Sequence, residues 1–239
     1  AYAGRRRINE VGHCIKRITK SGARAVSVDT QRCGYNHNLL IGRVFEWLLD
    51  LAASELCLGI IIMPPCGGYA PNRLENDGGP PALFDSDNPD GIALRNGELP
   101  HGAQLTLQHG QITADLAKAV HSHAGKVIIE QPVNHSENSL WPIKGREKHS
   151  TFFETSIFKK LRNEVPGDFV YSDLCMTGAP SRKSTAQFCN LAALPYVTKY
   201  FGDLLCCHDS HPVTLKGKNE QGEFVTKGSG EYTPMHCQL

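Results

Sequence analysis

Short apolar runs alternate with helical patterns along most of this chain. Four runs rich in β-branched residues have the length of strands buried on both faces of a sheet, and they cover 25–29, 58–63, 126–130 and 168–175. Between them, apolar residues recur every three or four positions, which predicts amphipathic helices over 8–18, 39–53, 112–120 and 153–161. This alternation predicts an α/β fold with a doubly wound, mostly parallel sheet and right-handed crossovers.

Two stretches lack the alternation. Between Gly67 and Pro100 the residues Gly, Pro, Asn and Asp dominate without any period, which is typical of a long functional loop. After Asn190 the pattern fades, and two short runs at 213–216 and 223–226 predict a β-hairpin. We therefore expect a main domain over residues 1–190 and a small C-terminal subdomain over residues 191–239.

Composition narrows the classes of protein that fit. The 25 Lys and Arg residues nearly balance the 24 Asp and Glu residues, which argues against a strongly basic nucleic-acid binder and against a polybasic membrane anchor. No run approaches the roughly 18 apolar residues of a membrane span. Nine cysteines are an odd set and too sparse for a disulfide framework, so we expect mostly free thiols and an intracellular location, in cytoplasm or nucleus.

Two predicted strands deliver reactive groups at their carboxyl ends, where open α/β sheets bind ligands. Cys66 follows an apolar run and two prolines, and Glu130 closes the run that precedes Gln131 and Pro132. A thiolate is a nucleophile when a cation supports it, and a partly desolvated carboxyl can donate a proton at neutral pH. The simpler alternatives are a buried cysteine that acts as a small hydrophobe and a glutamate that caps a turn.

The start of the chain has features of a nucleotide-type cofactor site. Gly4 would end a first strand and allow a cofactor to approach the backbone, while Asp29 follows the second strand and could accept hydrogen bonds from ribose hydroxyls. The alternative is an ordinary strand-to-helix turn whose basic end, Arg5 to Arg7, lies in solvent.

The order of these features resembles that of the DNA cytosine-5 methyltransferases. The residues that carry the resemblance are Gly4, Asp29, Pro64-Pro65-Cys66, Glu130 in a Glu-Gln-Pro sequence and the segment 178–183 after Tyr171. The resemblance covers residues 1 to about 190. The chain also resembles the methyltransferase-like segments of mobile-element or viral polyproteins.

This resemblance implies a Rossmann-like fold and a transferase that moves methyl from S-adenosylmethionine to nucleic acid. It implies that Cys66 attacks C6 of a flipped cytosine, that Glu130 donates a proton at N3, and that Lys183 supplies a cation of the site. The residues that it places at the cofactor are Tyr2, Gly4, Asp29 and Pro64. The interval 186–225 is too short for a usual DNA-reading region, which favours a single-stranded nucleic-acid partner.

A second class of function remains open, and with it whether the chain is an enzyme. Arg5 and Arg6 occupy positions where the cofactor of that family approaches the backbone. This departure favours a catalytically inactive module that keeps the fold and binds nucleic acid or protein. Its one concentrated basic patch would consist of Arg5 to Arg7, Lys16, Arg17, Lys20 and Arg24.

The C-terminal part contains a cluster of potential metal ligands. Cys206, Cys207, His208 and His211 could supply a tetrahedral zinc site. The spacing has no clean Cys-x-x-Cys pair, so the alternative is a buried thiol pair beside surface imidazoles.

Overall fold

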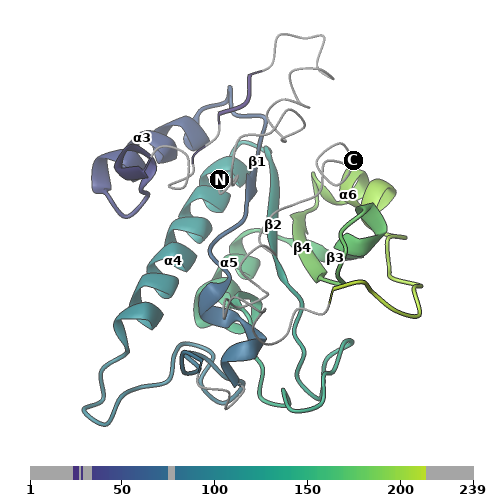
Figure 1. Cartoon of the computed structure of the whole chain (residues 1–239). Coiled ribbons are helices and arrows are strands. Elements are labelled where there is room, and N and C mark those ends of the chain that lie inside the picture. The colour runs from purple at the N-terminus through teal and green to yellow at the C-terminus, as the bar shows by residue number, and fades with distance from the viewer. Residues whose placement is uncertain (1–23, 27, 29–33, 75–78, 214–239) are drawn as a thin grey trace.

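The computed structural model describes residues 24–26, 28, 34–74 and 79–213. Its four strands form one sheet in the order β1-β2-β4-β3 (Figure 1). Strand β1 (Gly59–Ile62) is parallel to β2 (Lys126–Pro132), whereas β4 (Ser184–Asn190) is antiparallel to both β2 and β3 (Gly167–Asp173). Three strands therefore point in one direction and β4 in the other. The α/β class is confirmed, but the sheet is mixed rather than mostly parallel, because among the described strands only β1 and β2 pair in parallel. Strand β1 lies at the edge of this sheet and Ile61 is 38% exposed, so the run 58–63 is not buried on both faces as predicted.

Within the described residues, four α-helices surround this sheet. Their bounds are Gly42–Ala53 for α3, His101–His121 for α4, Ser156–Glu164 for α5 and Leu194–Phe201 for α6. The first three confirm the helices predicted from apolar periodicity. Because α4 connects the parallel strands β1 and β2, this part of the chain is a β-α-β unit.

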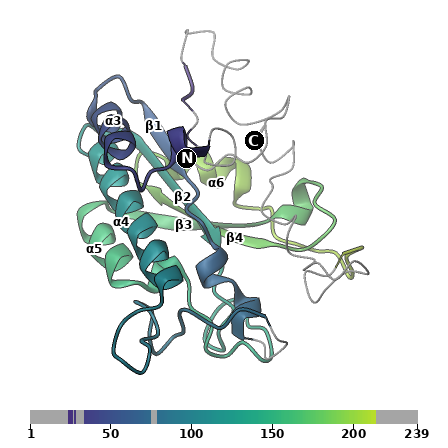
Figure 2. The same ribbon diagram turned by 60° about the vertical axis from the view of Figure 1, so that its left-hand side comes forward.

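Helices cover both faces of the sheet (Figure 2). Strand residues alternate between faces, so Ile129 and Phe188 belong to the large core shared with α3, α4 and α5. Their neighbours Ile128 and Cys189 belong to a smaller cluster with Val197 of α6. The sheet is thus the middle layer of three.

The large core is held by an aromatic cluster. Phe188 on β4 is fully buried, and its ring meets that of Phe158 on α5 at a centroid distance of 5.0 Å and an angle of 90°. Phe169 on β3 lies 5.6 Å from Phe188 and 4.9 Å from Phe153. Such edge-to-face pairs add to the free energy gained from burial alone.

The structure also contains elements that periodicity did not predict. All seven residues of β4 are buried although most are small or polar, so neither period appears in its sequence. The run 168–175 is a strand only to Asp173, and a 3-10 turn, η5 (Leu174–Thr177), follows. The long loop 67–100 contains two 3-10 helices, η2 (Gly67–Tyr69) and η3 (Pro71–Leu74).

Some predicted elements lie wholly or partly outside the described residues. These are the helix over 8–18, the hairpin beyond residue 213 and part of the strand over 25–29, whose described positions 25, 26 and 28 form no strand. In the part that is described, no helix is both long and apolar enough to cross a bilayer.

Phe188→Ala should destabilise the protein by about 3–5 kcal/mol, because it removes the ring at the centre of the aromatic cluster and leaves a cavity. Leu191→Ala is the matched control, since Leu191 is 63% exposed and its truncation should change the free energy of unfolding by less than about 0.5 kcal/mol. Denaturant unfolding followed by circular dichroism measures both. Equal effects would contradict this account of the core.

Candidate functional site

The loop that carries Cys66 is anchored at both ends. It leaves β1 through Pro64 and Pro65, and the carbonyl oxygen of Pro64 accepts a hydrogen bond of 2.7 Å from the side-chain amide of Gln131 on β2. At the other end, the carbonyl oxygen of Tyr69 accepts a hydrogen bond of 2.8 Å from Nε2 of His149. Both anchoring side chains are buried, so water does not compete for these bonds.

The middle of the loop is held as well. Nε of Arg73 donates a hydrogen bond of 2.6 Å to the carbonyl oxygen of Gly67. Gly68 lies so close to α4 that a Cβ atom there would be 2.5 Å from Oγ1 of Thr106, so only glycine fits without a shift of the neighbouring side chain. Cys66 therefore occupies a rigid turn, as a positioned nucleophile requires.

Three of the predicted site residues come together here. Lys183 just before β4 and Glu130 on β2 each act electrostatically on Cys66, which lies on the loop after β1. Burial raises the pKa of the Cys66 thiol; the ammonium of Lys183 acts in the opposite direction and lowers this pKa, while the charge of Glu130 raises it further. The thiol therefore responds to the charge of both neighbours.

Glu130 lies on a polar part of the sheet. It is 6% exposed and stands opposite Gln187 of β4 in the strand register. The side-chain amide of Gln187 donates hydrogen bonds to Oγ of Ser172, at 2.9 Å, and to Oγ1 of Thr185, at 3.1 Å. These buried residues form a continuous polar row across β2, β4 and β3.

This arrangement can support nucleophilic chemistry. A proton on Glu130 would remove the negative charge that opposes ionisation of Cys66, so an acidic Glu130 and a thiolate at Cys66 favour each other electrostatically. Lys183 favours the thiolate in either case. Transfer of the thiol proton to Glu130 would therefore leave a nucleophile and a proton donor in the same site.

Asp173, at the end of β3, ties the start of β4 to the segment after α6. Its buried carboxylate accepts hydrogen bonds from the Ser184 hydroxyl, from Nε of Arg182 at 3.3 Å and from the backbone N–H of Cys206 at 2.7 Å. Its own backbone N–H donates to the carbonyl oxygen of Leu204 at 2.7 Å. Arg182 and Ser184 flank Lys183, so these bonds position the cation of the site.

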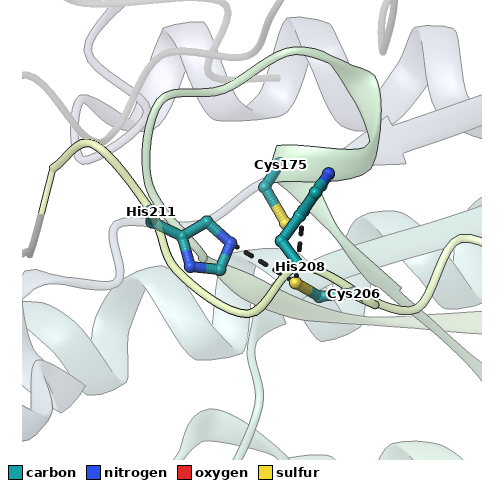
Figure 3. Close-up of side chains that lie close together, drawn as sticks. All are labelled: Cys175, Cys206, His208 and His211. Atoms are coloured by element: carbon teal, nitrogen blue, oxygen red, sulfur yellow. Dashed lines mark hydrogen bonds between the residues drawn. The ribbon is translucent and has the colours of Figure 1, made fainter.

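The predicted metal ligands are only partly brought together. Cys206, His208 and His211 lie close to one another, and the fourth member of the group is Cys175 of η5 (Figure 3). Cys207 is exposed and does not belong to this group.

The predicted cofactor residues are mostly outside the described part of the chain. Tyr2, Gly4 and Asp29 lie there, as does the basic patch apart from Arg24, which is exposed. Pro64 is described, and it is buried with its carbonyl oxygen bound by Gln131.

Sequence reasoning missed four residues that hold these sites together: Gln131, His149, Asp173 and Cys175. Only Gln131 carried a signal, namely its place between the candidate acid and the proline that closes the strand.

A scan against protein-family models, a search of curated proteins and a search of solved structures each find no match for this chain. Its function therefore has to be inferred from the side chains and their contacts.

Replacing the two charged neighbours should shift the reactivity of Cys66 in opposite directions. Glu130→Gln removes a negative charge, lowers the pKa of Cys66 and should speed its alkylation near pH 7.5 by about 3- to 10-fold. Lys183→Met removes a positive charge and should slow alkylation by a similar factor. Peptide-resolved mass spectrometry after timed iodoacetamide treatment measures the rate at Cys66, with the exposed Cys207 as the internal control. Rates that shift in the same direction would contradict the proposed electrostatics.

His149 should make the protein sensitive to mild acid. Nδ1 of His149 accepts a hydrogen bond from the backbone N–H of His135, so the ring is neutral, and burial lowers its pKa from 6.5 to about 4. Below pH 6.5 the unfolded chain binds a proton that the folded protein does not. The folded state should therefore lose about 3 kcal/mol as the pH falls from about 6.5 to about 4.

His149→Gln should flatten this pH dependence relative to the wild type, since glutamine does not titrate. Urea unfolding at pH 7.5, 5.5 and 4.5 on both proteins measures the difference, and the other histidines cancel in the comparison. Parallel profiles would show that His149 does not cause the acid sensitivity.

Proposed function

We propose that this chain is a methyltransferase of the cytosine-C5 type, with a Rossmann-like fold, that acts on nucleic acid. The observation that carries the proposal is that Lys183 and Glu130, which come from two other segments of the chain, both act electrostatically on Cys66. A thiol and a carboxyl can supply the nucleophile and the proton for covalent activation of a pyrimidine, and an ammonium favours the thiolate.

In this proposal the carboxylate of Glu130 takes the proton of the Cys66 thiol, and the sulfur adds to C6 of cytosine. Protonated Glu130 donates its proton to N3, which neutralises the charge that develops on the ring and leaves C5 electron-rich. S-adenosylmethionine, when bound, supplies the methyl group that C5 takes up. Water then takes the C5 proton, the sulfur leaves C6 as a thiolate, and N3 returns its proton to Glu130, which restores the aromatic ring.

The surroundings of Cys66 suit this sequence of steps. Burial disfavours the thiolate, so the free site keeps a protonated, unreactive thiol. The proton on Glu130 and the charge of Lys183 both favour ionisation once the base is in place. The anchored loop holds the sulfur in position without a large conformational change.

A base must leave its stack to reach groups at the ends of buried strands. Extrusion of the base from a duplex costs a few kcal/mol, whereas its removal from a single strand costs little. The interval 186–225 between the segment around Lys183 and Thr226 is too short for a usual region that reads duplex sequence, which favours single-stranded nucleic acid as the substrate.

A second candidate is a binding module that has lost catalysis. The raised pKa of Cys66 favours it, because a thiol that stays protonated is a poor nucleophile. Such a module would bind its ligand at the site around Cys66 without forming a covalent bond.

Covalent capture on a single-stranded oligonucleotide that contains 5-fluorocytosine, with S-adenosylmethionine present, distinguishes the two candidates. The wild type should form a complex that survives denaturing electrophoresis, because fluorine at C5 blocks the elimination that releases Cys66. Cys66→Ser should abolish capture, while Cys207→Ser, at an exposed thiol, should leave it unchanged. Binding without capture by the wild type would refute catalysis and support the binding module.

A further inference from the structure

We propose that Cys175, Cys206, His208 and His211 bind one zinc ion that fastens the segment after α6 to the turn after β3. The potential ligand atoms of these four residues all lie within 4.8 Å of one another. Figure 3 shows the two imidazoles directed at Sγ of Cys206, with Cys175 reaching the same point from η5. The inference is independent of the proposed methyltransferase activity.

The separations fit a common metal ion. Sγ of Cys206 is 3.5 Å from Nδ1 of His208 and 3.3 Å from Nε2 of His211. In a tetrahedral zinc site, bonds of about 2.3 Å to sulfur and about 2.0 Å to nitrogen place sulfur and nitrogen ligands about 3.5 Å apart. An ion could therefore enter between these side chains with small movements.

The choice of metal follows from the ligands. Two thiols and two imidazoles favour zinc over magnesium or calcium, which prefer oxygen ligands. Zinc binding would release the two thiol protons, and two thiolates with two neutral imidazoles balance the charge of the ion. Because the protein fills all four positions, no place remains for water or substrate, and the site is structural rather than catalytic.

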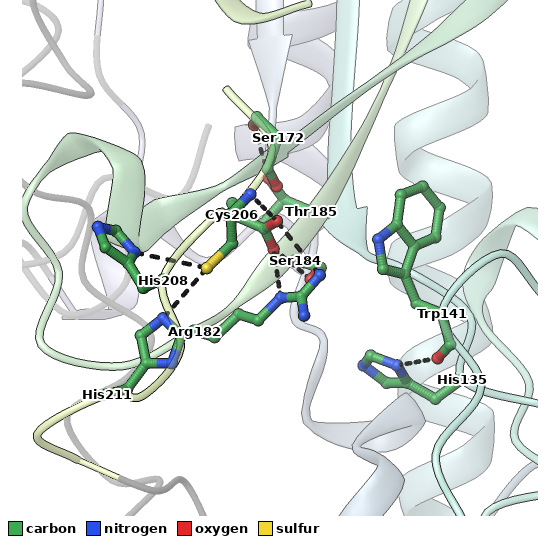
Figure 4. Close-up of polar contacts among 10 residues, drawn as sticks. His135, Trp141, Ser172, Arg182, Ser184, Thr185, Cys206, His208 and His211 are labelled. Carbon is green, nitrogen blue, oxygen red and sulfur yellow. Dashed lines mark hydrogen bonds and ion pairs between the residues drawn. The ribbon is translucent and has the colours of Figure 1, made fainter. Parts of the chain in front are cut away.

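The segment needs such a support because it buries little. None of residues 203–213 is fully buried, so apolar packing contributes little to its position. A few hydrogen bonds already hold it near η5, namely those between Asp173 and the backbone at Leu204 and Cys206, and one from the backbone N–H of Val213 to the carbonyl oxygen of Pro180 at 3.1 Å. Figure 4 shows Cys206 between the two histidines on one side and Arg182 and Ser184 on the other.

Metal analysis of the full chain, produced with zinc and then dialysed, tests the proposal. Cys175→Ser should reduce the zinc content by about one ion per chain relative to the wild type. Cys207→Ser is the matched control, because this neighbouring thiol is exposed and outside the group, and it should leave the zinc content unchanged. Comparing variants removes the contribution of any ligand elsewhere in the chain.

Two further measurements keep the test decisive. His208→Ala changes an exposed side chain, so it should fold, as circular dichroism can verify, and still lose the ion. Cobalt in place of zinc should give the strong visible bands of a tetrahedral site in the wild type and in Cys207→Ser but not in His208→Ala. An equal zinc content in the wild type, Cys175→Ser and His208→Ala would overturn the proposal. A Cys175–Cys206 disulfide in protein freshly purified with a reductant present would also overturn it.

Discussion

The arrangement at the carboxyl end of β3 depends on one buried carboxylate, Asp173. Its Arg182 partner is 46% exposed on its side chain, so solvent screens much of that ion pair. The Ser184 hydroxyl and the backbone N–H of Cys206 compensate the buried charge more effectively, since hydrogen bonds to a charged group contribute about 1.5–3 kcal/mol each. Without these donors the carboxylate would be buried and uncompensated, which is strongly unfavourable. One side chain thereby fixes the start of β4 and the segment after α6.

This carboxylate also connects the two candidate sites. Lys183 lies between Arg182 and Ser184, and its backbone carbonyl oxygen accepts a hydrogen bond from Leu174 at 3.0 Å. The same turn continues to Cys175 of the Cys/His group. Lys183 lowers the pKa of Cys66, so its position matters for the thiol. Arg182 and Ser184, which flank Lys183, and Cys206 of the Cys/His group therefore bond to the same carboxylate.

The parts of the fold that apolar periodicity encodes could be predicted, and the parts that polar contacts decide could not. Apolar runs and helical spacing identified β1, β2, β3 and three helices, because each contributes apolar side chains to one of the two clusters of the core. Strand β4 was not predicted, because several of its buried residues are polar and form hydrogen bonds across the sheet. Its sequence therefore has no apolar pattern. Cys66 and Glu130 could be named as candidate site residues because they follow apolar runs. The roles of Cys175 and Asp173 arise from contacts between distant segments, which the sequence does not show.

The two faces of β4 have different surroundings, one aromatic and one polar. Phe188 faces the aromatic cluster, while Gln187 and Thr185 face the polar row beside Glu130. Within the described part of the chain, the buried oxygens Oε1 of Gln131 and Oε1 of Gln187 accept no hydrogen bond, and each such group costs about 1–3 kcal/mol. Burial of one large aromatic side chain offsets a cost of that size.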